Sequence, residues 1–258
     1  MPRYEIPSDL SDLYGAIGFP ARVTYSNFVA SLDGVVALGS EMSAGSIISG
    51  RNQADRFLMG LLRACADAVL LGAGTLRATP GHRWTPEHIF PGMAGPFARL
   101  RSDLGKAPRP RLVLFSASGD IPESHPAVID GATIITTERG AATLEGRLPP
   151  SSEVLAIEKD GRVDVERAVA ELRRRGDEVL LTEGGPHLMA DLVRANLVDE
   201  LFITVSPVLA GRGAGRDSET RHGMLAGAEL LPDRQVWSRL LSARRNEDFL
   251  FLRYGLTL

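Results

Sequence analysis

Hydrophobic positions along the 258-residue chain follow two different spacings. Short apolar runs bounded by Gly, Pro or Asp predict buried strands, whereas apolar residues spaced three and four apart predict one face of a helix. The clearest helical stretch begins at Gln53 and ends near Ala66. Its apolar face consists of Ala54, Phe57, Leu58, Leu61, Leu62 and Cys65.

The remaining pattern predicts alternating strands and helices. A helix follows Asp164, which is placed to be its N-cap, and another runs from Pro186 to about Ala195. Residues 39–50 and 78–110 predict loops, because they lack long apolar runs and are rich in Gly, Pro or Arg. Strands are predicted at 22–30, in "DAVLLGAGT" (67–75), and at 111–115, 132–136, 154–157, 178–182 and 200–207.

The C-terminal stretch "VWSRLLSARRNEDFLFLRYGL" predicts two strands joined around Asn246-Glu247-Asp248. We expect this pair to be antiparallel and the earlier strands, which alternate with helices, to be mostly parallel. The fold class is therefore α/β. With no internal repeat and no linker, we expect an N-terminal extension over residues 1–20 and a single domain over 21–258.

Composition narrows the possible partners. The formal net charge of -3 argues against nucleic acid, which needs a basic surface. No apolar run approaches the ~18 residues of a membrane span. The N-terminal sequence has acidic residues and no apolar core, unlike a signal peptide. We expect a cytoplasmic protein that acts on a small molecule.

Cysteine and histidine exclude further classes. Cys65 is the only cysteine, and its place on the apolar helix face predicts a buried structural thiol. The five histidines have no helical metal-site spacing, so we expect no metal site.

Glycine or small polar residues end three of the predicted strands, in "LLGAGTLRA" (70–78), "LFSASGD" (114–120) and "LLTEGGPHL" (180–188). Ligands of open α/β sheets bind beyond such strand ends. In the last stretch the glycines serve either a tight turn or the close approach of a phosphate, and Pro186 suits the first turn of the next helix. All three stretches together favour one extended ligand with several phosphates.

A dinucleotide fits that requirement, although the usual GxGxxG fingerprint is absent. No acidic residue follows at the distance expected for NAD. Ser116 and Ser118 instead end their strand with hydroxyl groups that can bind a 2′-phosphate. NADPH is therefore favoured over NADH, while an ordinary serine turn is the alternative explanation.

Four ordered motifs resemble the reductase of riboflavin biosynthesis, the C-terminal half of the bifunctional deaminase/reductase. They are "SLDG", "LLRACADAVLLGAGT", "EGGPHL" and "LVDELFITVSPVLAG", and the similarity runs from about Arg22 to Gly213. The resemblance implies a dihydrofolate reductase-like fold, reduction of 5-amino-6-(5-phosphoribosylamino)uracil with NADPH, and a homodimer.

The resemblance also implies roles for individual residues. Glu183 matches a position that reaches the substrate and is the candidate catalytic residue, while Ser43 and Arg63 match substrate contacts. For Arg63 a solvated position near a helix end is the alternative. The implied cofactor contacts are Val29, Gly74, Thr75, Thr79, Ser116, Gly184, Gly185, Pro186, His187 and Leu188.

The chain departs from the family after "GAGT". The family has an acidic "DDP" and an arginine that holds the substrate's phosphate, whereas this chain reads "LRATPGHRWTP". Thr79 stands where an aspartate is expected, and Arg83 is only near the arginine position. The departure affects the expected substrate and leaves the expected cofactor site intact.

Asp55 suggests a second candidate activity. Its position before the strand ending at Gly72 resembles that of the acidic residue that binds and helps protonate the pteridine in dihydrofolate reductases. An aspartate that offsets the helix dipole is the alternative. A dihydrofolate or pterin reductase and a non-catalytic NADPH-binding protein therefore stay open beside the pyrimidine reductase.

Overall fold

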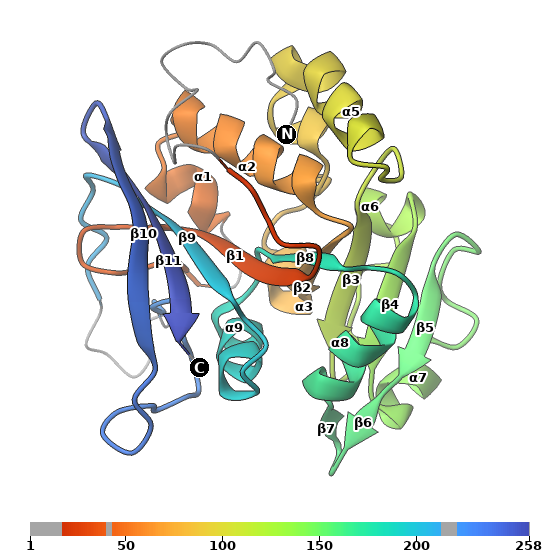
Figure 1. Ribbon diagram of the computed structural model, residues 1–258. Helices are drawn as coiled ribbons and strands as arrows, with labels where there is room; N and C mark the ends of the chain where they lie inside the picture. The colour runs from red at the N-terminus through yellow and green to blue at the C-terminus, as the bar shows by residue number, and fades with distance from the viewer. Residues whose placement is uncertain (1–16, 40–42, 213–220, 258) are drawn as a thin grey trace.

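The structure is a computed structural model that describes residues 17–39, 43–212 and 221–257. Within these residues nine strands form one sheet in the order β10-β11-β9-β1-β8-β2-β3-β4-β5. The strands from β9 to β5 pair in parallel, and β11 pairs antiparallel with both β9 and β10. This confirms the expected dihydrofolate reductase-like α/β fold with an antiparallel C-terminal pair (Figure 1).

The sheet strands are β1 (Val23–Ala30), β2 (Ala68–Gly72), β3 (Arg111–Ser116), β4 (Ala132–Thr136), β5 (Glu153–Ala156), β8 (Val179–Thr182), β9 (Glu200–Val205), β10 (Trp237–Asn246) and β11 (Phe249–Thr257). A small hairpin pairs β6 (Glu158–Lys159) with β7 (Arg162–Val163). The helices are α1 (Ala44–Ile48), α2 (Gln53–Cys65), α3 (Ala73–Arg77), α4 (Pro86–Ile89), α5 (Ala94–Asp103), α6 (Pro126–Ile129), α7 (Glu138–Leu144), α8 (Val165–Arg174) and α9 (Pro186–Arg194), with a 3-10 turn at Pro91–Met93.

Alternate residues of the central strands enter two cores, one on each face of the sheet. In β2, Val69 and Leu71 belong to a core that includes apolar side chains of α2 and α5, whereas Leu70 belongs to one that includes side chains of α8 and α9. Figure 1 shows α2 and α5 on one side of the strands and α8 and α9 on the other. Burial on both faces explains why these strands read as continuous apolar runs.

The predicted N-cap is confirmed, since the Asp164 side chain accepts a hydrogen bond from the backbone amide of Arg167 at the start of α8. Asn52 caps α2 in the same way, accepting from the amide of Asp55. Cys65 is buried in the first core, as expected, and burial raises the pKa of its thiol to about 12. None of the described helices is long and apolar enough to cross a membrane.

The predicted loops at 39–50 and 78–110 are wrong in part, because they contain α1, α4 and α5. The α5 segment, "AGPFARLRSD", has few apolar residues, and tertiary contacts stabilise it instead. Phe97 packs on Phe57 of α2 with ring centroids 6.0 Å apart. The buried Arg101 donates its Nη1 to the carbonyl oxygens of Arg63, Ala64 and Ala66, where α2 ends.

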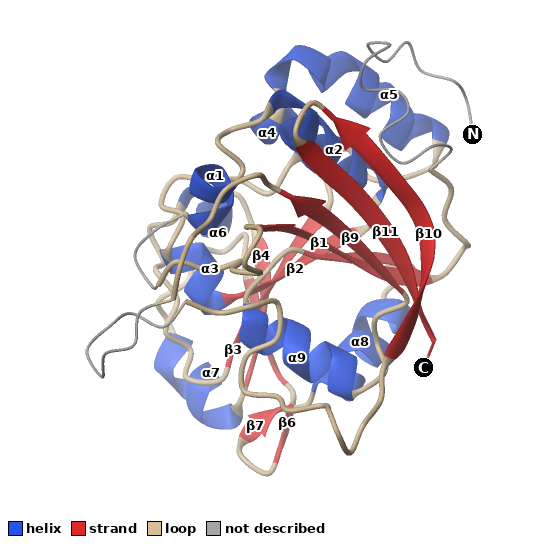
Figure 2. Ribbon diagram, turned by 90° about the vertical axis from the view of Figure 1, so that its left-hand side faces the viewer, coloured by secondary structure: helices blue, strands red, loops and turns tan. Residues whose placement is uncertain are grey.

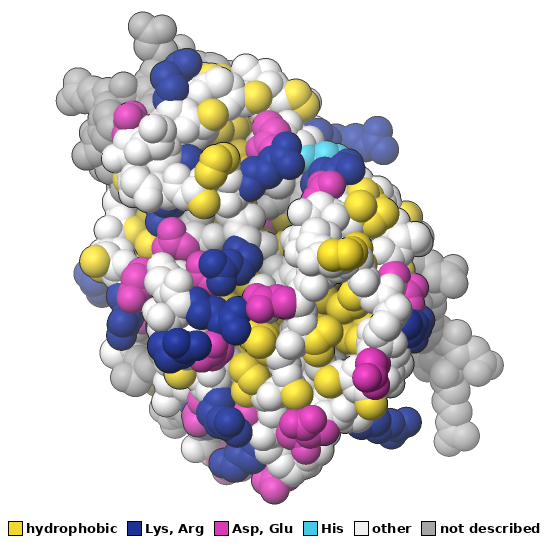
Figure 3. All heavy atoms as spheres, turned by 90° about the vertical axis from the view of Figure 1, so that its right-hand side faces the viewer, with side chains coloured by type: hydrophobic (Ala, Val, Ile, Leu, Met, Phe, Trp, Pro, Cys, Tyr) yellow, Lys and Arg dark blue, Asp and Glu magenta, His cyan; other side chains and the backbone are white. Residues whose placement is uncertain are grey.

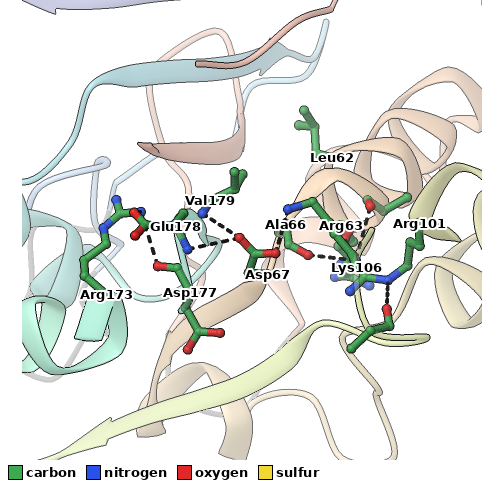
Figure 4. A network of polar contacts seen from close by, with 12 residues as sticks. Leu62, Arg63, Ala66, Asp67, Arg101, Lys106, Arg173, Asp177, Glu178 and Val179 are labelled. Atoms are coloured by element: carbon green, nitrogen blue, oxygen red, sulfur yellow. Dashed lines mark hydrogen bonds and ion pairs between the residues drawn. The ribbon is translucent and has the colours of Figure 1, made fainter. Parts of the chain in front are cut away.

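Asp67 continues this polar network at the amino-terminal ends of the strands (Figure 4). Its carboxylate accepts hydrogen bonds from the Lys106 ammonium group at 2.6 Å and from the backbone amides of Glu178 and Val179 at 3.1 and 2.8 Å. The network joins the end of α2 to the starts of β2 and β8. It thereby fixes the position of Arg63 near the carboxyl end of α2.

The face of the molecule that carries β5 and α7 has basic and acidic side chains mixed together (Figure 3). Arg175, for example, pairs with Glu153 of β5 at 2.6 Å and with Glu171 at 2.7 Å. The Arg173-Arg174-Arg175 run closes α8, where cations offset the negative end of the helix dipole.

Candidate active site

A large cavity, of about 1470 Å³, lies at the carboxyl ends of the central parallel strands. The ends of β1, β2, β3 and β8 contribute to its wall, and β8 lies between β1 and β2. Residues of α1, α2, α3 and α9 complete the wall, and Figure 2 shows α1, α3 and α9 arranged around this region. This is the edge at which open parallel sheets bind ligands.

The cavity brings together nearly all the site residues expected from the sequence. Gly184 is the exception among them, because it does not line the wall. The wall residues among the expected set are Val29, Ser43, Asp55, Arg63, Gly74, Thr75, Thr79, Ser116, Glu183, Gly185, Pro186, His187 and Leu188.

The two adjacent glycines have different reasons for lacking a side chain. A Cβ on Gly184 would come within 2.8 Å of the Leu71 backbone, so this glycine lets β8 pack closely on β2. Gly185 has a φ of +74°, which only glycine adopts readily, and it directly precedes α9 with Pro186 in the first turn. The glycine pair therefore forms a tight turn, and Gly185 in that turn also lines the cavity.

The strand predicted within 67–75 ends at Gly72, and the rest of the "GAGT" stretch begins the short helix α3. A Cβ on Gly74 would meet no atom within 4 Å, so internal packing does not require this glycine. The Thr75 hydroxyl lies 3.5 Å from the position that a Cβ on Gly185 would take. Thr79 has a local role, since its hydroxyl donates to the Thr75 carbonyl oxygen at 2.7 Å.

The other expected cofactor residues come from separate elements. Ser116 ends β3 and is mostly buried, while the partly exposed Val29 lies near the end of β1. Along α9, Leu188 packs into the second core and the His187 ring contacts that of His222, with centroids 5.4 Å apart.

Arg63 and Glu183 form an ion pair in the cavity wall. Arg63 Nη2 lies 2.6 Å from Glu183 Oε2, and Arg63 Nε lies 3.0 Å from Glu183 Oε1. The side chains are only 1% and 4% exposed. The solvated position considered for Arg63 is therefore wrong. A buried bidentate pair of this kind holds both groups in fixed orientations.

Asp55 is the second buried carboxyl group of the wall. Burial and the nearby Glu183 carboxylate raise its pKa, the neighbouring Thr204 and Ser49 hydroxyl groups partly offset this, and the resulting pKa is about 6. A carboxyl group with this pKa holds a proton in part of the population near neutral pH. It is thus able to donate a proton to a bound molecule.

Several wall residues have no signal in the sequence. His82 and Trp84 come from the segment predicted as a loop, and their rings meet edge to face with centroids 4.8 Å apart. Burial, with Arg63 nearby, lowers the pKa of His82 to about 2, so its imidazole is neutral. Only the path of the chain between β2 and β3 brings these rings to the cavity.

Arg83, which lies near the expected phosphate-binding arginine in the sequence, is not a wall residue. Its Nε lies 2.5 Å from Asp130 Oδ2 in an ion pair at the surface. Asp33 of "SLDG" is a turn residue that also fixes a neighbouring loop. Its carboxylate accepts the amides of Ala210 and Gly211 at 3.0 and 2.8 Å.

Comparison with known proteins agrees with this geometry. The chain is 29% identical over 200 residues to the 2,5-diamino-6-ribosylamino-4(3H)-pyrimidinone 5′-phosphate reductase of Archaeoglobus fulgidus, covering 76% of this chain and 84% of that protein. It is 25% identical over 182 residues to the Aquifex aeolicus protein of the same name, covering 70% and 75%.

Among solved structures, a pyrimidine reductase-like protein of Corynebacterium diphtheriae has a TM-score of 0.70 at 19% identity, covering 98% of this chain and all of that one. This likeness supports the fold. The family model described as the RibD C-terminal domain matches residues 22–238. The chain therefore belongs to the RibD C-terminal domain family, and it is an oxidoreductase of the pyrimidine reductase type, which implies a nicotinamide cofactor.

Proposed function

We propose that this protein reduces a ribosylaminopyrimidine phosphate with NADPH, as the names of its relatives indicate for those proteins. The observation that carries the proposal is the arrangement of the wall. Glycine turns after β2 and β8 adjoin a buried pair of charged groups in one cavity large enough for two ligands.

The wall fits a dinucleotide at its glycine turns. Gly74 leaves open space, and the first turn of α9 offers backbone N–H groups and the positive end of the helix dipole to a pyrophosphate. Gly185, Pro186, His187 and Leu188 would contact the pyrophosphate, together with Gly74 and Thr75. Ser116 would accept or donate a hydrogen bond at the 2′-phosphate. Val29 would lie beside the nicotinamide.

The bound nicotinamide supplies a hydride, which in this reaction reduces the ribose C1′ carbon in its open, imine-like form. The protein's own residues bind, orient and exclude water. Glu183, held by Arg63, would orient the substrate, since it directly precedes the glycine turn. Donor and acceptor carbons that meet at about 3–3.5 Å without water need little further assistance.

We expect NADPH to bind at least about tenfold more tightly than NADH, a gap of about 1.4 kcal/mol. Replacing Gly185 with valine should weaken both cofactors strongly, because a side chain enters the turn and a β-branched residue resists a φ of +74°. Isothermal titration calorimetry measures both effects. Circular dichroism must show that the variant is folded, and Gly92→Val, at an exposed glycine outside the cavity wall, is the control.

Equal affinity for NADPH and NADH would contradict the 2′-phosphate argument. Unchanged affinity in a folded Gly185→Val protein would leave the glycine with a purely structural role. Steady-state NADPH oxidation with 5-amino-6-(5-phosphoribosylamino)uracil tests the activity itself.

Asp55 favours a second candidate, reduction of dihydrofolate or another pterin. Its buried carboxyl group lines the cavity and has a raised pKa, as a proton donor to a bound heterocycle requires. Dihydrofolate therefore belongs in the same substrate panel. We keep the cytoplasm as the proposed location.

We further propose a homodimer that uses the β10–β11 ribbon. The outer strand β10 has an open hydrogen-bonding edge, and the ribbon exposes Trp237, Leu240, Leu241 and Leu250, with exposed fractions of 71%, 51%, 36% and 44%. An exposed apolar edge strand promotes pairing with another chain.

Sedimentation velocity should give the mass of a dimer, about twice 27.8 kDa. Replacing Trp237 and Leu240 with lysine should give a folded monomer, because charges on an edge strand oppose pairing. A matched double replacement of Ile47 and Ile129, exposed residues of other elements, should leave the mass unchanged. A wild-type monomer at micromolar concentration would contradict the proposal.

A further inference from the structure

The cavity wall is not uniformly charged. At the end formed by α1, α2 and the turn between them, it carries the cations Arg51, Arg56 and Arg63 and the carboxyl groups of Asp55 and Glu183. Figures 1 and 2 show these two helices far from the β6–β7 hairpin, near the opposite end of the molecule. The hairpin end carries Lys159 and Arg162, which are accompanied by Asp160, Asp164 and Glu166.

Two of the three arginines already have partners. Arg63 is paired with Glu183. Arg56 donates its Nε and Nη2 to the carbonyl oxygen of Ile89 at 3.2 and 2.9 Å. Three guanidinium groups face two carboxyl groups here, so the α1–α2 end has an excess of positive charge even with both carboxyl groups ionised.

Arg51 supplies the unpaired charge. Among the described residues its guanidinium has no hydrogen bond or ion pair, although the residue is exposed and lines the cavity. Its backbone has a φ of +57°, which is uncommon for a residue other than glycine. Two backbone hydrogen bonds fix this turn. The amide of Arg51 donates to the carbonyl oxygen of Ser46, and the amide of Asn52 donates to the carbonyl oxygen of Ser49.

Hydroxyl groups accompany Arg51 on the same part of the wall. Ser43 and Ser46 both line the cavity at α1. Ser49 also lines it, but its hydroxyl lies beside Asp55 and interacts with that carboxyl group. Within the described part of the chain, the Arg51 guanidinium and the Ser43 and Ser46 hydroxyl groups have no hydrogen-bond partner. Together they offer donors suited to a phosphate monoester, because an arginine can bind two phosphate oxygens at once.

We propose that Arg51, with Ser43 and Ser46, binds the 5′-phosphate of the substrate. This inference rests on the proposed function, and it makes the α1–α2 turn a determinant of substrate choice. Arg83, the arginine nearest to the position at which the family's sequence pattern leads one to expect this contact, is engaged by Asp130 outside the wall. The positive charge at the cavity therefore comes from a different segment of the chain.

The test compares 5-amino-6-(5-phosphoribosylamino)uracil with its dephosphorylated riboside. In the wild type the phosphorylated substrate should have the lower KM. Arg51→Gln should raise that KM by between about 10-fold and about 100-fold, the effect of losing a charge-assisted contact. Its kcat and its KM for the riboside should stay nearly unchanged. Arg51→Lys should recover part of the loss, and Arg139→Gln, which removes an exposed arginine outside the cavity, should have no effect.

Calorimetry with ribose 5-phosphate provides a readout that needs no turnover. Wild-type protein should bind it and Arg51→Gln should not, with NADPH affinity equal in both. Equal rates on the two pyrimidines in the wild type, or a preference for phosphate that Arg51→Gln retains, would overturn the phosphate site while leaving the proposed reductase intact. Absence of turnover on either pyrimidine would refute the proposed substrate. In that case, binding of ribose 5-phosphate that is lost in Arg51→Gln would still support the phosphate site. No binding to the wild type, or equal binding to both proteins, would overturn the site.

Discussion

Replacing Glu183 with glutamine should destabilise the protein by about 3 kcal/mol and reduce turnover of the ribosylaminopyrimidine phosphate. The stability loss follows from burial, since the Arg63 guanidinium would keep its charge with only 1% of its side chain exposed and no carboxylate beside it. Removing one partner of a buried ion pair typically costs about 3–5 kcal/mol, and the glutamine oxygen recovers part of that as a hydrogen-bond acceptor. Urea unfolding measures the change.

Two comparisons separate the buried charge from other effects. The double variant Arg63→Met/Glu183→Gln should be more stable than Glu183→Gln alone, because no unpaired charge is left in the wall. Glu87→Gln removes the partner of Arg109 in an exposed pair, with side chains 35% and 60% exposed, and should change stability by less than about 1 kcal/mol. A Glu183→Gln protein as stable as the wild type would mean that the Arg63–Glu183 pair does not contribute to the free energy of unfolding.

Turnover separates a positioning role from a purely structural one. Measured on folded Glu183→Gln protein, the rate on the pyrimidine substrate should fall while NADPH affinity stays nearly constant. A loss of NADPH affinity in step with the rate would instead place the effect of Glu183 in the cofactor site.

Asp55→Asn should affect one candidate activity strongly and the other little. On dihydrofolate the variant should lose on the order of 10²-fold or more in rate, as expected for the loss of a positioned proton donor. On the ribosylaminopyrimidine phosphate it should change little. Wild-type protein that oxidises NADPH with neither substrate would exclude both reductase activities on these compounds and favour the non-catalytic NADPH-binding protein.

The same substitution should stabilise the protein at neutral pH. The pKa of Asp55 rises from an ordinary value of 3.8 to about 6 on folding, so the folded protein binds the proton more tightly than the unfolded chain. The stability that this proton provides is complete below pH 3.8 and is lost as the pH rises through 6. At pH 7.5, Asp55→Asn should therefore be more stable than the wild type by up to roughly 3 kcal/mol.

Urea unfolding at several pH values checks the sign, and the difference should shrink toward zero as the pH falls from 6 to 4. Asp33 is the matched control with the opposite sign. Its hydrogen bonds with Ser31 and with the amides of Ala210 and Gly211 lower the pKa of Asp33 to about 2. Asp33→Asn should thus be destabilised at neutral pH, with a difference that disappears as the pH falls through 2. A pH-independent difference for Asp55→Asn would show that its carboxyl group is not protonated on folding.

Local physical chemistry determined much of the fold from the sequence. The strand at 132–136 and the helix beginning at Gln53 have the predicted bounds or nearly so, because burial on one or both faces imposes the apolar spacing directly. The caps at Asn52 and Asp164 are equally local, since each bonds within one helical turn. Prediction was poor for α5, whose stability depends on contacts with α2 rather than on its own composition.

The site divides in the same way. Glycines, hydroxyl groups and Pro186 at strand ends identified the cavity edge, because parallel strands bring their carboxyl ends together. Tertiary structure alone decided what the charged residues do. Arg63 meets Glu183 from 120 residues away because β8 inserts between β1 and β2. Asp55 has a raised pKa because packing buries it. Arg51 has no partner among the described residues because its turn faces the cavity. No spacing in the sequence encodes which charges become buried or paired.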